Sequence, residues 1–142
     1  MLKLLHPIAG AVAFLTILSF WFATVVSEVF GSIDMIVAVK QTIPWGLLIL
    51  VPALATTGAS GFRVAGESSD LRIKAKRQRM QGIAANGVLV LIPCMFALKS
   101  LATQHEFGVL FIGLQSLELI AGAFNLTLMA FNIRDGLRLR GH

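Results

Sequence analysis

The chain has 142 residues, of which 56% are hydrophobic and only 13% are charged. A water-soluble domain carries about 25% charged residues, so this composition excludes an ordinary soluble domain. The formal net charge is +5, but no aromatic and basic platform accompanies it, which excludes nucleic acid and leaves the lipid bilayer as the expected partner.

The first predicted element is a transmembrane helix over about 7–30. Pro7 suits a first helical turn, where its missing N–H is not needed. The apolar run is long enough to cross about 30 Å of hydrocarbon, and it is too long for the apolar core of a cleaved signal peptide. Gly31 and Ser32 break the run, and we interpret 33–41 as a joint between helices.

Three further transmembrane helices are predicted, over about 42–60, 81–102 and 107–133. The second begins near Pro44. A basic loop over 62–80 separates the second helix from the third, and its second half is also compatible with an amphipathic helix on the membrane surface. Residues 103–106 form a short joint before the fourth helix.

The basic residues orient these helices. Lys3, six residues of 62–80 and three residues after 133 lie on one side, so that side holds ten of the twelve Lys and Arg residues. Cytoplasmic loops collect Lys and Arg, so both termini are expected in the cytoplasm. The sequence therefore predicts an all-α, integral membrane, antiparallel four-helix bundle that forms a single transmembrane domain over 1–142.

A polar seam runs along the fourth predicted helix. Its members are spaced alternately three and four residues apart, which places them on one face. They are Gln115, Glu118, Gly122, Asn125, Met129 and Asn132. Because amide and charged side chains are costly in lipid, the seam is expected to face protein, water or a bound group. Contacts between helices and the lining of a cavity both remain open as interpretations.

Glu118 needs a partner if it is ionised inside the membrane. Glu28, Lys40 and Lys99 belong to the same half of the predicted bundle. A site that Glu28 and Glu118 share with Lys99 is one expectation, either as a structural cluster or as a group that relays protons or binds cations.

His6 precedes the first helix in the segment Leu5-His6-Pro7-Ile8-Ala9-Gly10, and Gly10 lies one turn further along the same face. This segment resembles the opening helix of small cytochrome b-type membrane proteins, including the cytochrome b561 group. The resemblance implies haem b with His6 as an axial metal ligand. A flat macrocycle held by His6 would need a small residue at the position of Gly10 in order to lie close to the helix. Arg63 is a candidate partner for the haem propionates on the same side.

The second haem ligand is not obvious. His105 lies at the opposite end of the bundle, and His142 is the last residue. Met80, Met129 or His6 of a second copy are the candidates, since iron accepts a His and Met pair. A homodimer, another homo-oligomer or a larger membrane complex is therefore expected.

The overall layout resembles small four-helix proteins of the bacterial inner membrane, which implies a multi-pass location there. No catalytic motif is recognisable, so the question of enzyme activity stays open. Three functional hypotheses follow. The chain is a haem b protein for electron transfer, an accessory or structural subunit of a membrane complex, or a small transporter that uses the polar seam.

Overall fold

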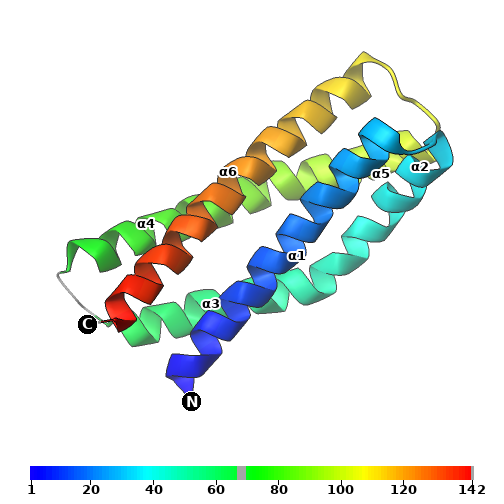
Figure 1. Ribbon diagram of the computed structural model, residues 1–142. Helices are drawn as coiled ribbons and strands as arrows, with labels where there is room; N and C mark the ends of the chain where they lie inside the picture. The colour runs from blue at the N-terminus through cyan, green and yellow to red at the C-terminus, as the bar shows by residue number, and fades with distance from the viewer. Residues whose placement is uncertain (67–69, 142) are drawn as a thin grey trace.

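Four long helical segments make up the part of the protein that the structure describes (Figure 1). The structure is a computed structural model that describes residues 1–66 and 70–141. Residues 67–69 of the predicted basic loop lie outside the described residues. The four segments that are long and apolar enough to cross a membrane are Lys3–Phe30, Ile33–Arg63, Leu71–Thr103 and Val109–Arg138. The prediction of an all-α chain with four membrane-length helices is confirmed.

The segments contain the following elements. The first is helix α1 (Leu2–Phe30), and the last is helix α6 (Val109–Arg140). The second segment joins α2 (Ile33–Thr42), a 3₁₀ turn η1 (Ile43–Gly46) and α3 (Leu47–Ala65). The third joins α4 (Leu71–Asn86), a π-helical turn η2 (Gly87–Leu91) and α5 (Ile92–Thr103).

Residues 33–41, interpreted from the sequence as a joint, form helix α2 instead. The hydroxyl of Ser32 caps this helix by accepting a hydrogen bond from the Met35 N–H at 3.3 Å. Asp34 lies in the first turn, where a negative charge complements the helix dipole. Pro44 stands in the first turn of η1, the 3₁₀ turn that separates α2 from α3.

Much of the predicted loop over 62–80 is also helical. Helix α3 continues to Ala65 and ends at Gly66, whose φ of 56° is a left-handed conformation that glycine adopts readily. Helix α4 begins after Asp70, whose carboxylate accepts a hydrogen bond from the Arg72 N–H at 2.9 Å. It continues through η2 into α5. The wider π turn stands directly before Pro93, which cannot donate to the preceding turn.

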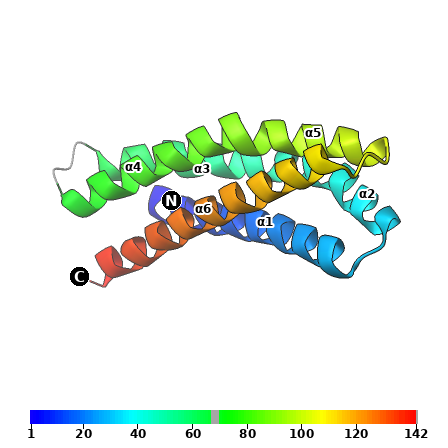
Figure 2. The same cartoon turned by 90° about the horizontal axis from the view of Figure 1, so that it is seen from above.

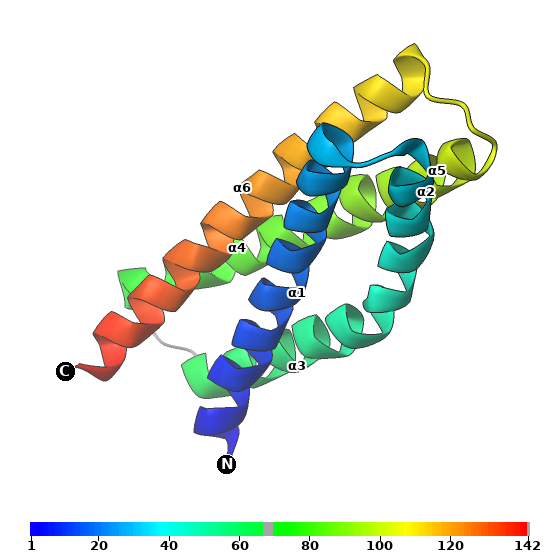
Figure 3. The same ribbon diagram turned by 45° about the vertical axis from the view of Figure 1, so that its right-hand side comes forward.

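Helix α6 packs against three other helices, α1, α4 and α5. Helix α3 packs on α1, and α2 packs on α5. Seen from above, α1 and α6 lie along one side of the molecule, and α3, α4 and α5 lie along the other (Figure 2). Figures 1 and 3 show both ends of the chain at the same end of the molecule.

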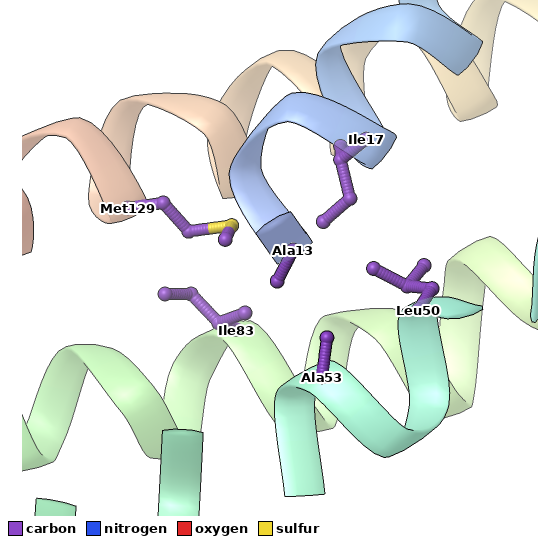
Figure 4. Packing of buried hydrophobic residues seen from close by; sticks show 6 residues of the cluster. All are labelled: Ala13, Ile17, Leu50, Ala53, Ile83 and Met129. Atoms are coloured by element: carbon purple, nitrogen blue, oxygen red, sulfur yellow. The ribbon is translucent and has the colours of Figure 1, made fainter. Parts of the chain in front are cut away.

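The central core joins α1, α3, α4 and α6 (Figure 4). Its buried residues are Ala13, Ile17, Leu50, Ala53, Ile83 and Met129. Ala13 and Ala53 are small, which permits close approach of α1 and α3. A second buried cluster, Leu98, Ala102 and Phe111, joins α5 to α6.

Large apolar side chains cover the outside of every segment. Leu15 is 58% exposed, Leu48 71%, Leu89 73% and Ile120 70%. Such a surface is unfavourable in water and is favourable against lipid tails. The four segments therefore have the surface and the length of a multi-pass membrane protein.

Candidate functional site

His6 is fixed against helix α3. Its Nδ1 lies 3.0 Å from the carbonyl oxygen of Thr57 and 3.2 Å from the hydroxyl of Ser60. A carbonyl oxygen only accepts, so the hydrogen of this bond belongs to Nδ1. In the neutral ring the lone pair is then on Nε2, and a backbone carbonyl on the other nitrogen is the usual support of a metal-ligating histidine.

Gly61 allows the imidazole to reach this position. A Cβ atom at Gly61 would lie 3.0 Å from Cε1 of His6, closer than almost all real contacts of this kind. At Gly10 a Cβ atom would be 3.7 Å from Cγ2 of Thr57, an ordinary contact. Gly61 is therefore the glycine that the position of His6 depends on.

A cavity of about 350 Å³ opens beside His6, at the end of the molecule that holds both chain termini. Helices α1, α3, α4 and α6 line it. Its polar and thioether residues are Lys3, His6, Thr57, Lys76, Met80, Met129 and Asn132. Gly10 also lines this cavity, so three of the residues that the haem hypothesis names, His6, Gly10 and Met129, share one site.

Arg63, the fourth residue of that hypothesis, is exposed in the last turn of α3 and is not among the lining residues. Lys3 and Lys76 supply positive charge at the cavity instead. A Cβ atom at Gly136 would lie 3.0 Å from Nζ of Lys76, so this ammonium lies against helix α6.

Asn132 connects the cavity to an ion pair. Its Oδ1 accepts a hydrogen bond from Nη1 of Arg79 at 3.4 Å, and the same Nη1 lies 2.6 Å from Oδ2 of Asp135. Asn132 is only 6% exposed, and its Nδ2 is buried without a hydrogen-bond partner among the described residues. The wall of the cavity therefore contains a buried amide that has donor capacity left over.

The rest of the polar seam on α6 makes contacts between helices. Asn125 is 2% exposed and pairs with Asn86, whose Nδ2 donates to Oδ1 of Asn125 at 2.9 Å. Gly122 is buried and leaves room for Trp21, whose indole N–H donates to the carbonyl of Leu119 at 2.9 Å. These two positions serve helix packing.

Glu118 forms its ion pair with Lys40, at a distance of 3.4 Å, and not with Lys99. Lys40 is the more deeply buried partner, with 2% of its side chain exposed against 16% for Glu118. Glu118 also lines a second, mostly apolar cavity of about 350 Å³ between α3 and the η2 turn. Gln115, the first residue of the seam, is 6% exposed, and both of its amide atoms are buried without a partner in the described chain.

Sequence reasoning missed Thr57, Ser60 and Gly61, because their role depends on how α1 and α3 are rotated against each other. Within the described ranges, no group of three or more His, Cys, Asp or Glu side chains is placed to hold a metal ion. A haem needs no such group, since one or two side chains complete its iron coordination. In comparisons with protein-family models, curated proteins and solved structures, the chain matches none.

Proposed function

We propose that the chain is an antiparallel four-helix bundle in a bacterial inner membrane, with both termini in the cytoplasm. Two observations support this orientation. Ten of the twelve Lys and Arg residues belong to the side of Lys3 and the C-terminus. Both chain ends also lie at the same end of the molecule (Figure 1).

Within that bundle we propose a haem b site for electron transfer in the His6 cavity. The observation that carries the proposal is that His6, Gly10 and Met129, which the sequence singles out for this role, line a single cavity. His6 is held through Nδ1, as ligating histidines are. Bound haem supplies a one-electron couple, and the axial ligands and their surroundings set its potential.

The residues at the cavity fit such a group. His6 from α1 would hold the iron, and Met129 from α6 or Met80 from α4 would offer a thioether as a further ligand. Lys3 and Lys76 would form ion pairs with the two carboxylates of haem. The Nδ2 of Asn132 would donate a hydrogen bond to an acceptor atom of the bound group. If neither methionine binds iron, His6 of a second copy completes the ligand set, which makes a homodimer part of the proposal.

Absorption spectroscopy tests this proposal. Protein purified from cells supplied with a haem precursor should show a Soret band and a reduced-minus-oxidised difference spectrum. His6→Ala should remove both, whereas His105→Ala, an exposed residue at the opposite end, should remove neither. Met129→Leu should change the spectrum if Met129 is the other ligand. Colourless wild-type protein would end the haem proposal.

A small transporter is the second candidate function. The observation that favours it is the buried pair of Lys40 and Glu118 inside membrane-length helices, because ionisable groups at such positions mark paths for ions or protons. An accessory or structural role in a larger membrane complex is the remaining alternative. Protein that shows neither haem absorbance nor any response to added ions would support this role.

A further inference from the structure

A second polar cluster lies at the end of the bundle that is opposite the chain termini. It consists of Glu28 on α1, Lys40 on α2, and Gln115 and Glu118 on α6, and is called the Lys40 cluster below. Glu118 stands about 14 Å along α6 from Val109, at about 1.5 Å per residue, so it is well inside the membrane-length segment. None of its members lines the His6 cavity.

Contacts and electrostatics hold the Lys40 cluster together. Nζ of Lys40 lies 3.4 Å from Oε1 of Glu118. Glu28 interacts electrostatically with both of these groups. Helix α5 contributes Cys94, a buried thiol within electrostatic range of Glu118. Two carboxylates therefore face a single ammonium in the membrane interior.

Hydrogen bonding in the Lys40 cluster is incomplete. Oε1 of Glu28 is buried without a partner among the described residues. Gln115, which is 6% exposed, has neither Oε1 nor Nε2 paired in the described chain. Because Gln115 and Glu118 are three residues apart on one helix, their side chains lie on the same face. An unpaired amide of this kind normally marks a bound water or ligand.

The balance of charge identifies the ligand. With both carboxylates ionised and Lys40 protonated, the Lys40 cluster carries one excess negative charge. A charge left without a counter-charge inside a membrane is costly, and a proton or a bound cation removes that cost. We propose that the Lys40 cluster is a site for one positive charge, supplied by a proton or by a monovalent metal cation. The Oε1 atoms of Glu28 and Gln115 are the acceptors that it uses.

Infrared difference spectroscopy of the purified protein in lipid nanodiscs tests the proposal, because a protonated carboxyl has its own C=O band. In a buffer that contains choline as the only added cation, wild type should show this band at neutral pH. Glu28→Gln and Glu118→Gln each leave one carboxylate opposite Lys40, so each should lose the band. Glu106→Gln, at an exposed site in the joint before α6, should keep it.

Lys40→Met provides the opposite change. Removing the ammonium leaves two carboxylates without a fixed partner, so both should take up protons and the band should about double. If this variant does not fold, the two Gln variants still decide the question. The readout does not involve haem, so its result is independent of the His6 proposal.

Adding NaCl in place of choline chloride distinguishes the two sources of charge. Loss of the wild-type band in NaCl identifies a metal cation that displaces the proton, and persistence of the band identifies a proton alone. Equal carboxylic acid absorption in wild type, Glu28→Gln and Glu118→Gln, throughout a pH titration in both salts, would overturn the proposal.

Discussion

Asn86 and Asn125 form a direct amide pair between α4 and α6. Nδ2 of Asn86 donates to Oδ1 of Asn125 at 2.9 Å and also lies 2.9 Å from the carbonyl oxygen of Ala121. Asn125 in turn donates to the carbonyl of Ile83 at 3.4 Å. The amide pair therefore ties two side chains and two backbone carbonyls together at the centre of the bundle.

Asn125→Ala should lower the free energy of unfolding by about 1–2 kcal/mol, because hydrogen bonds between membrane helices contribute about that much. Unfolding in mixed micelles measures the effect. Thr127→Ala is the matched control, since Thr127 is exposed and bonds only to its own helix at Ala123. The Asn86→Ala and Asn125→Ala effects should also be less than additive when combined. Additive effects would show that the two amides act separately.

Gly61 and Gly58 offer a closely matched comparison for the His6 site. Gly61→Ala should displace the imidazole by a few tenths of an ångström, because the new Cβ would lie 3.0 Å from Cε1 of His6. Gly58→Ala meets nothing within 4 Å. We expect a lower melting temperature and less haem per polypeptide for Gly61→Ala only. Equal melting temperatures and equal haem contents for the two variants would show that the site does not depend on the packing of His6 against α3.

Arg79 and Asp135 are the ion pair behind the His6 cavity. Asp135→Leu leaves Arg79, 23% exposed, with its contacts to Asn132 and to the ring of Phe131 but without a carboxylate, and should cost about 2–3 kcal/mol of stability. Arg138→Ala, an exposed substitution on the same helix, should cost less than about 0.5 kcal/mol. Denaturation of both variants in micelles gives the comparison. If the Asp135→Leu variant were as stable as Arg138→Ala, the ion pair would not stabilise this end of the bundle.

Reporter insertions check the orientation of the four helices. An alkaline phosphatase reporter at Ser32 or at His105 should be active, because both positions are expected outside the cytoplasm. The same reporter at Asp70 should be inactive, and a cytoplasmic fluorescent reporter there should fluoresce. An active phosphatase at Asp70 would reverse the proposed topology.

The sequence was sufficient for the four membrane-length helices, because each is a long apolar run bounded by polar residues. It was insufficient at residues 33–41, which were interpreted as a joint after the break at Gly31 and Ser32 and which belong to α2. The structural roles of the two charged residues in this segment, Asp34 and Lys40, do not follow from the order of residues in the chain. Asp34 favours the start of α2, and Lys40 pairs with Glu118 from a helix that begins many residues later.

The site was predictable to a similar extent. The spacing of His6 and Gly10 and the periodicity that includes Met129 identified three residues that line one cavity. Lys76 and Gly61 were not recognised as parts of it, because charge and glycine content do not reveal which way a helix is rotated. Depth alone also did not distinguish Lys40 from Lys99 as the partner of Glu118.

Lys40 and Glu118 form an ion pair between α2 and α6. Glu118→Leu removes the carboxylate that lies 3.4 Å from Lys40, a lysine that is 2% exposed, and leaves only the electrostatic interaction with Glu28, so stability should fall by about 3 kcal/mol. Leu117→Ala, at a neighbouring exposed position, should change stability little. The double variant Lys40→Met with Glu118→Leu removes both charges of the ion pair and leaves Glu28, which a proton can neutralise. It should recover most of the loss, because the apolar pair carries no desolvation cost. Reversible unfolding of the three variants in micelles measures these differences. Equal stability of Glu118→Leu and Leu117→Ala would mean that Lys40 reaches water in the membrane, which contradicts its burial.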